Sequence, residues 1–313
     1  MGKFKTCSRG SLAWRRTVKN VLFTSACMDS SGYAEASRNY ICALAQQPEI
    51  NLSVRPTSFE SWKTDIGEYK QIIEPLLNKK SFVPDTQIIH LTPENYRHYK
   101  MPGVKNIGYT VWETNKLPDV WVGMLNEMDE IWVPCQWNVE VSKESGVKVP
   151  VKCIPHTFNK SSFERIEETK FNIPQNTVNF YSIFQWSARK NPQALLQAYF
   201  SEFTEEDNVR LILKTYVRNN GPGDREYVKK LVSAIKDHLW LTDAPKIILV
   251  HEALSREEIL QLHSVCDCFV LPHRAEGWGI PHFEAMAMGN HCIATGFSGN
   301  LEFMNENNST LLD

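Results

Sequence analysis

Four features are absent or scarce in this sequence of 313 residues, and each absence excludes a class of protein. No apolar run is long enough to cross a bilayer, and no secretory signal opens the chain. The formal net charge is only −2, so neither a nucleic acid nor a membrane surface is expected as an electrostatic partner. The eight cysteines include no C-x-x-C pair, which indicates reduced thiols in a cytoplasmic protein.

The composition that remains is typical of a globular protein, with 42% hydrophobic and 22% charged residues. A chain of this length can bury a large core, and two domains are expected rather than one. Residues 1–17 are polar and basic, and we expect them to form a flexible arm.

Short apolar strands alternate with amphipathic helices through both halves of the chain. Strands are expected at 20–25, 51–54, 87–91, 106–111, 130–134 and 151–155, and again at 178–183, 209–214, 247–250, 268–271 and 291–295. Helices are expected at 69–77 and 137–143, and a flexible loop at 221–224 precedes a helix that ends at 235. This alternation predicts an α/β protein of two Rossmann-like domains, with the active site in the cleft between them.

The most informative stretch is 272–289, which reads PHRAEGWGIPHFEAMAMG. A loop with two glycines joins an expected strand to a short apolar helix. Pro281 suits the start of that helix, and Gly289 can end it. The free amides of a first helical turn and the positive end of the helix dipole both favour a phosphate group. The sequence therefore predicts an anion site at this loop.

Two carboxylates flank the loop. Glu276 precedes the glycines, and Glu284 lies in the first turn of the helix, eight positions later. A carboxylate accepts hydrogen bonds at two oxygens, so Glu276 can hold one sugar and Glu284 a ribose, with a diphosphate on the amides between them. Alternatively, Glu284 only complements the helix dipole, and Glu276 is a solvated loop charge.

The segment from Glu276 to Gly289 resembles the signature of the family 4 retaining glycosyltransferases, in which two glutamates are separated by seven residues. The resemblance implies the GT-B fold, with two Rossmann-like domains and a central cleft. It further implies that a sugar moves from a nucleotide-sugar donor to an acceptor with retention of configuration. Neither a metal nor a further cofactor is expected. Residues 155–159 resemble the interdomain junction of this family, which implies an acceptor-side domain at 1–160 and a donor-binding domain at 161–313.

The resemblance also assigns residues that bind the donor. The family's phosphate-binding lysine matches Lys190, but the arginine that many members carry six positions earlier is replaced by Phe184. Either Arg189 substitutes for that arginine, or Lys190 and the loop amides hold the diphosphate alone. Alternatively, Arg189 and Lys190 have no binding role and are a solvated pair at the start of a helix. The amides expected to contact the donor belong to Gly277, Trp278, Gly279 and Ile280.

In the first half, Gly32 lies in a segment that resembles the family's first glycine loop, where acceptor and donor phosphates approach the backbone. His90 ends an expected strand, where the family often places a histidine near the transferred sugar. Thr92 is an alternative occupant of that position, and a core role for His90 stays open. Glu113 is expected to face the acceptor, or else to cap a turn. The predicted catalytic residues are Glu276, Lys190 and His90.

The chain stops at Asp313, soon after the signature, whereas members of the family normally continue through further helices. The sequence therefore leaves two alternatives beside a self-sufficient transferase. One is a donor-binding but inactive pseudo-transferase, or a subunit that needs a partner chain. The other is a different enzyme on the same fold, such as a phosphorylase or a sugar-nucleotide epimerase. The acceptor is not identified by the sequence.

Overall fold

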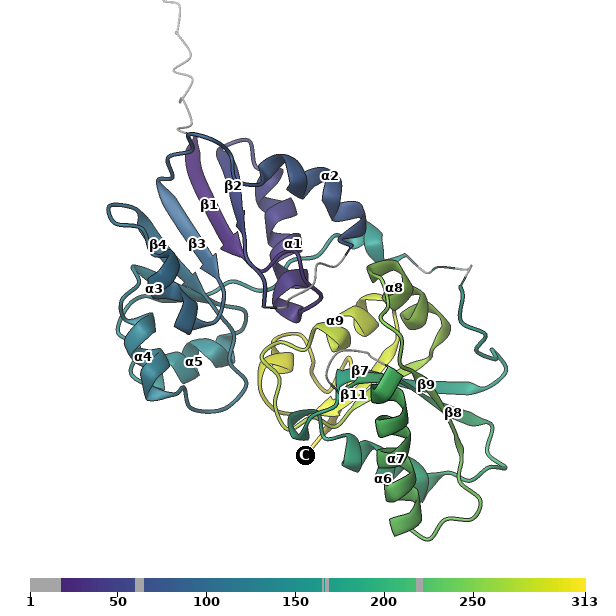
Figure 1. The fold of residues 1–313 in the computed structure, drawn as a ribbon. Coiled ribbons are helices and arrows are strands. Elements are labelled where there is room, and N and C mark those ends of the chain that lie inside the picture. The colour runs from purple at the N-terminus through teal and green to yellow at the C-terminus, as the bar shows by residue number, and fades with distance from the viewer. Residues whose placement is uncertain (1–17, 60–64, 165, 167–168, 218–221) are drawn as a thin grey trace, which may run out of the picture.

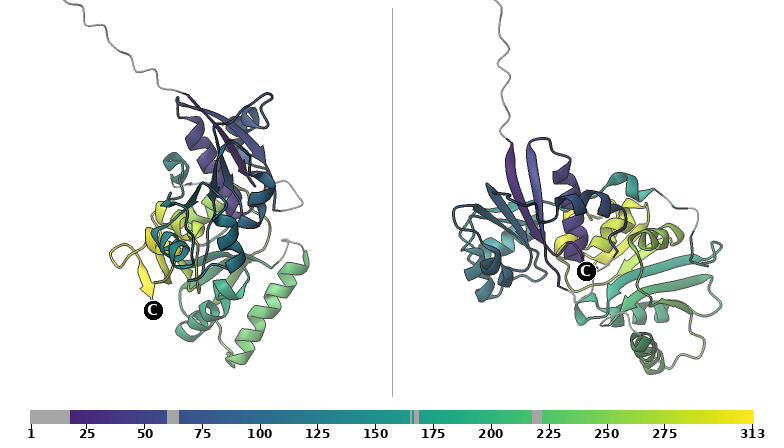
Figure 2. Two further views of the ribbon diagram at one scale, coloured as in Figure 1. Left: turned by 90° about the vertical axis from the view of Figure 1, so that its left-hand side faces the viewer. Right: turned by 45° about the horizontal axis from the view of Figure 1, so that its top comes forward.

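The structure divides into two lobes, each built around its own sheet (Figure 1). The computed structural model describes residues 18–59, 65–164, 166, 169–217 and 222–313. The predicted arm at 1–17 lies outside the described residues, as does Gly221 of the expected loop. Two further views show helices packed against both sheets (Figure 2).

The first lobe contains a six-stranded parallel sheet. Its strands are β1 (Lys19–Ser25), β2 (Ile50–Pro56), β3 (Thr86–His90), β4 (Lys105–Tyr109), β5 (Glu130–Val133) and β6 (Val151–Cys153). Their spatial order is β2-β1-β3-β4-β5-β6, so the winding of the chain reverses between β1 and β3. Ser25 and His90 are register partners at the carboxyl ends of these two strands. Ligands of open α/β sheets bind beyond such a switch point.

The second lobe repeats this arrangement. Its strands are β7 (Val178–Gln185), β8 (Val209–Tyr216), β9 (Lys246–Val250), β10 (Cys268–Leu271), β11 (His291–Thr295) and β12 (Thr310–Leu312). Their order is β12-β11-β10-β7-β8-β9, and all the pairings are parallel. The winding here reverses between β7 and β10. The segment with Lys190 follows β7, and the glycine loop follows β10, so the fold brings both to one switch point.

The connecting helices pack on the faces of the two sheets. They are α1 (Gly32–Ala45), α2 (Lys70–Ile73), α3 (Tyr96–Tyr99), α4 (Asp119–Leu125), α5 (Gln136–Glu144), α6 (Pro192–Glu202), α7 (Pro222–His238), α8 (Arg256–Val265) and α9 (Ile280–Ala287). Short 3-10 turns add η1 (Gly67–Tyr69), η2 (Glu74–Leu76), η3 (Pro93–Asn95), η4 (Lys160–Phe163), η5 (Ala188–Lys190) and η6 (Gly299–Glu302). The predicted α/β architecture is confirmed.

Local sequence explains several helix ends. Helix α8 begins with a capping box, because the Ser255 hydroxyl accepts from the Glu258 amide and the Glu258 carboxylate accepts from the Ser255 amide. The expected helix at 69–77 is instead divided into η1, α2 and η2, since Pro75 lacks the amide that a continuous helix would need. Helix α7 begins at Pro222, earlier than predicted, and a proline is well suited to a first helical position.

The position that the resemblance aligns with the family's arginine lies in the core of the second lobe. Phe184, at the end of β7, is buried among apolar residues such as Leu196 and Phe269. A guanidinium in this environment would lose its water without gaining a carboxylate partner. The first lobe has two apolar cores, one around Phe23 and one around Ile89. The predicted boundary near residue 160 stays a prediction.

Candidate functional site

The glycine loop is fixed by its own backbone and by neighbouring turns. Gly279 caps α9 with a φ of +88°, in the left-handed region that favours glycine. The Glu276 amide donates to the Ser298 hydroxyl at 2.8 Å, and the Gly299 amide donates to the Glu276 carbonyl at 2.8 Å. A Cβ on Gly299 would lie 2.1 Å from the Gly277 carbonyl oxygen, so only glycine fits there. The loop is thus held rigidly in front of α9.

Glu276 is the most strongly paired carboxylate of this loop. Its side chain contacts both Lys190, through an ion pair, and Arg189, whose Nη1 lies 3.1 Å from Oε2. Glu276 is only 5% exposed, and burial alone would raise its pKa. The charges of Lys190 and Arg189 outweigh burial and lower the pKa of Glu276 to about 2. The structure therefore brings together three residues that the sequence placed in the donor site.

Two buried histidines lie beside Glu276. The ring centroids of His273 and His282 are 5.2 Å apart, and both residues are at most 1% exposed. Burial lowers the pKa of His273 to about 4 and that of His282 to about 3, against the opposing charge of Glu276. Both rings are therefore neutral at physiological pH. Sequence analysis did not identify them, because nothing in the motif distinguishes a loop histidine from a buried one.

Glu284 lies on α9 and is also 5% exposed, but its partners differ. Arg256, the first residue of α8, forms an ion pair with its Oε1, and His263 Nε2 lies 3.5 Å from its Oε2. Burial would raise the pKa of Glu284, but Arg256 and then His263 lower it. Sequence analysis missed Arg256, because the adjoining capping box already explained that segment as an ordinary helix start.

Glu113 approaches the donor side from the first lobe. Its Oε1 lies 3.5 Å from Nη2 of Arg189, and Arg189 Nη1 also donates to the Ala275 carbonyl at 2.9 Å. Burial raises the pKa of Glu113, and the charge of Arg189 opposes that change. Arg189 therefore lies between Glu113 and Glu276, in front of the loop.

His90 is enclosed by aromatic rings of the first lobe. Its Nδ1 is 2.7 Å from the Ser37 hydroxyl, and its ring centroid is 4.6 Å from that of Tyr109. Burial holds the pKa of His90 well below its usual range. His156 lies between His90 and the loop, with ring centroids 6.4 Å from His90 and 5.2 Å from Trp278. The predicted role of His90 near the transferred sugar stays a prediction.

The two lobes touch at the glycine loop. A Cβ on Gly277 would lie 2.0 Å from Cγ2 of Val111 in the first lobe, and a Cβ on Gly32 would lie 3.7 Å from Cδ1 of Ile280. Trp278 is almost fully buried and packs against Phe303, with ring centroids 5.0 Å apart. Close approach thus explains the need for glycine at position 277, whereas Gly32 has room for a methyl group.

A small interdomain pocket lies behind these contacts. Its walls include Glu35 and His156 from the first lobe side and Arg256, Trp278 and Glu284 from the second. Glu284 therefore faces a pocket that both lobes build.

In the described ranges no helix has both the length and the apolar character that a membrane span requires. Nor do three histidine, cysteine, aspartate or glutamate side chains gather there as metal ligands.

Known proteins resemble parts of this chain in sequence. Residues 164–312, just under half of the chain, match the family Glycosyl transferases group 1. The alpha-monoglucosyldiacylglycerol synthase of Streptococcus pneumoniae is 23% identical over 223 residues. The match covers 68% of this chain but 46% of that protein, so the chain spans about half the length of this curated relative.

Solved structures resemble nearly the whole chain. Sucrose-phosphate synthase from Thermosynechococcus elongatus has a TM-score of 0.70 at 14% identity, covering 94% of this chain and 86% of that one. The Anabaena protein HepE, solved in complex with UDP-glucose, has a TM-score of 0.65 at 15% identity, covering 94% and 85%. At such identities the likeness establishes the fold, which is GT-B. Together with the family match, it supports a glycosyltransferase.

Proposed function

We propose that this protein is a retaining, metal-independent glycosyltransferase that moves a sugar from a nucleotide-sugar donor to an acceptor hydroxyl. The observation that carries the proposal is the ion-paired cluster of Glu276, Lys190 and Arg189 at a rigid glycine loop before a helix start. Cations, free amides and a carboxylate are what a diphosphate and an attached sugar require. The family match of the second lobe supports the same assignment.

We propose a role for each charge of this cluster. Lys190 and Arg189 would stabilise the negative charge that develops on the departing diphosphate, together with the amides at 277–280. Glu276 would accept hydrogen bonds from the sugar hydroxyls, and Glu284 from the ribose. In the free protein the cations neutralise Glu276, so that a bound diphosphate would share them with this carboxylate.

The first lobe would supply the acceptor side, with Glu113 and His90 near the reacting sugar and the backbone at Gly32 near the phosphates. We place this lobe at residues 1–160 and the donor lobe at 161–313, in a protein of the cytoplasm. HepE was solved with UDP-glucose, which makes a UDP-sugar the first donor to test.

Calorimetric titration with a panel of nucleotide sugars tests the proposal. We expect one donor to bind, and its affinity to fall at least about tenfold in both Lys190→Ala and Glu284→Gln, because hydrogen bonds to charged groups are lost. Glu127→Gln, in an exposed ion pair with Arg97, is the matched control and should leave binding unchanged. Absence of binding to the folded wild-type protein would overturn the proposal.

The chemistry needs a second measurement. Adding an acceptor should release free nucleotide, and NMR of the product should show the same anomeric configuration as the donor. Donor binding without nucleotide release for any acceptor would favour a pseudo-transferase, or a subunit that requires a partner chain.

A further inference from the structure

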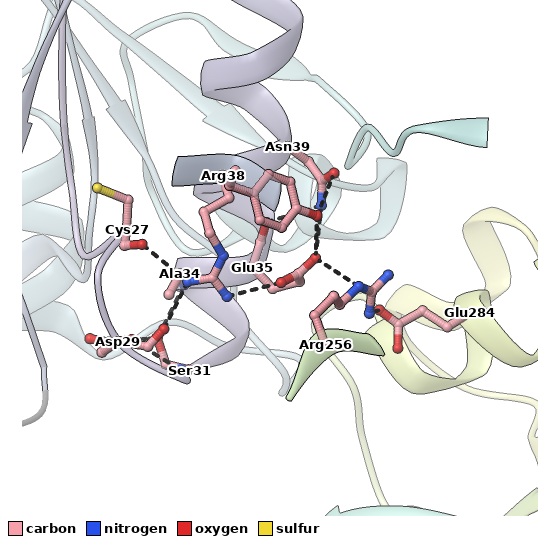
Figure 3. A network of polar contacts seen from close by, with 10 residues as sticks. Cys27, Asp29, Ser31, Ala34, Glu35, Arg38, Asn39, Arg256 and Glu284 are labelled. Carbon is pink, nitrogen blue, oxygen red and sulfur yellow. Dashed lines mark hydrogen bonds and ion pairs between the residues drawn. The ribbon is translucent and has the colours of Figure 1, made fainter. Parts of the chain in front are cut away.

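Arg256 contacts both lobes at once (Figure 3). Its Nη1 pairs with Oε1 of Glu284 on α9, and its Nε lies 3.4 Å from Oε1 of Glu35 on α1. The guanidinium also lies over the ring of Phe163, 5.6 Å from the centroid. The planar fork of an arginine presents donors in two directions, which a lysine ammonium cannot do with the same geometry. Arg256 therefore links the carboxylate proposed for the ribose to the first helix of the other lobe.

Glu35 is held in place by its own lobe. Its Oε2 accepts from Arg38 at 2.9 Å, and its Oε1 accepts from the Tyr69 hydroxyl at 2.8 Å and from Asn39 at 3.2 Å. Arg38 is in turn fixed by the carbonyls of Cys27 and Asp29 in the loop after β1. Glu35 is consequently held in place through Arg38 by the loop after β1, and Figure 3 shows these contacts.

The bridge leaves hydrogen-bonding positions open on the Glu284 carboxylate. A carboxylate has about four lone-pair positions, and Arg256 and His263 approach one oxygen each. Ribose hydroxyls can therefore donate to Glu284 while Arg256 stays in place. Arg256 would then keep Glu284 ionised and offset the negative charge of a nearby diphosphate. Moving the lobes apart, by contrast, would separate Arg256 from Glu35 and expose both side chains to water.

We propose that Arg256 is a positioning residue that couples nucleotide-sugar binding at Glu284 to closure of the two lobes through Glu35. The inference rests on the proposed function, because it takes a nucleotide sugar as the ligand. It adds a residue that neither the family signature nor the capping box identified. Since coupling is reciprocal, weakening closure must weaken donor binding, and donor binding must favour closure.

The test combines donor titration with small-angle X-ray scattering of the free and donor-saturated full chain. Arg256→Gln should weaken donor binding by about tenfold or more, and Glu35→Gln by about threefold to tenfold, within the usual range of coupling between sites. We expect the wild type to show a donor-induced decrease in radius of gyration, and both variants should lose it. The double variant should bind no more weakly than Arg256→Gln alone, because both changes break one bridge.

Several outcomes overturn the inference. Wild-type affinity in Arg256→Gln would do so, as would additive losses in the double variant or normal compaction in Glu35→Gln. If Glu35→Gln does not fold, Tyr69→Phe removes the hydroxyl that orients Glu35 and leaves both charges of the bridge. Arg97→Gln, in an exposed pair, should match the wild type. Failure of the wild type to bind any nucleotide sugar would instead refute the proposed function, so the two failures are distinguishable.

Discussion

Two Glu–Arg–Glu bridges cross between the lobes, one on each side of the glycine loop. In the first, Arg189 lies between Glu276 and Glu113, and in the second, Arg256 lies between Glu284 and Glu35. The contacts to the first lobe are similar in length, at 3.5 and 3.4 Å. Their surroundings differ, since the Arg189 and Glu113 side chains are 36% and 32% exposed, and those of Arg256 and Glu35 are 19% and 13% exposed.

The difference in exposure distinguishes the roles that we propose for the two bridges, with Arg256 coupling the lobes and Arg189 contacting the donor. Ion pairs open to water contribute little, whereas a buried pair is costly to break because one charge is left without a partner. Glu276 also has a second cation, Lys190, that belongs to its own lobe. Glu284 has one arginine, and that arginine also contacts the other lobe. The Arg256 bridge is therefore the one expected to depend on lobe position.

Acid should produce the largest loss of stability, because it protonates histidines that are buried near the bridges. His273 and His282 beside Glu276, and His156 in the first lobe, have pKa values of about 4, 3 and 3 because burial lowers them. The unfolded chain therefore binds more protons below pH 6.5, and the free energy of unfolding falls as the pH decreases from 7 to 5. Each histidine should contribute about 2 kcal/mol of loss at pH 5. Urea unfolding at both pH values measures this.

Glu276 should not contribute in that pH range. The pKa of Glu276 is lowered to about 2, so its stabilisation is lost only as the pH falls from about 4.5 toward 2. His282→Gln should recover about 2 kcal/mol of the loss between pH 7 and 5. A wild-type pH dependence in His282→Gln would contradict this assignment.

Removing Lys190 from its ion pair with Glu276 should have the next largest effect on stability. Lys190 is 12% exposed, and Lys190→Ala leaves Glu276 buried with Arg189 as its remaining cation. We expect about 3 kcal/mol of destabilisation in urea unfolding for Lys190→Ala. For Arg189→Ala we expect about 1 kcal/mol or less, because that side chain is partly solvated. Equal losses would show that exposure does not decide the strength of these contacts.

The close contact between the lobes provides a steric test. Gly277→Ala places a methyl group 2.0 Å from Cγ2 of Val111, and we expect about 1–3 kcal/mol of destabilisation from overpacking unless the lobes move apart. X-ray scattering should then show an enlarged free protein, and Val111→Ala should restore the wild-type size. Gly32→Ala has 3.7 Å to Ile280 and should change neither quantity. The same size in all variants would argue against contact at the loop.

The smallest loss of stability is expected when the contact between Arg189 and Glu113 in the first bridge is removed. Glu113→Gln removes a contact of 3.5 Å between side chains that are each about one-third exposed. Its free energy of unfolding should stay within about 0.5 kcal/mol of the wild type. A larger loss would mean that the two bridges are equivalent, which would contradict the comparison.

Much of this architecture followed from local patterns in the chain. The apolar strands, the glycine loop at 277–279 and the capping box at Ser255 each depend on residues within a few positions of one another. The expected helix at 69–77 failed for a local reason as well, since Pro75 interrupts its hydrogen bonds. The sequence aligned Phe184 with the family's arginine, and only the structure placed this side chain in the apolar core.

The sequence by itself thus determined the α/β class, the two repeated lobes and the two glutamates of the loop. Only the tertiary structure decided which cations those glutamates meet. Arg256 is 28 positions from Glu284, and Glu35 lies in the other lobe, so their meeting depends on how α8 and α9 pack against α1. The physical reason is that backbone patterns act over a few residues, whereas charge pairing is decided by distances that the whole fold sets.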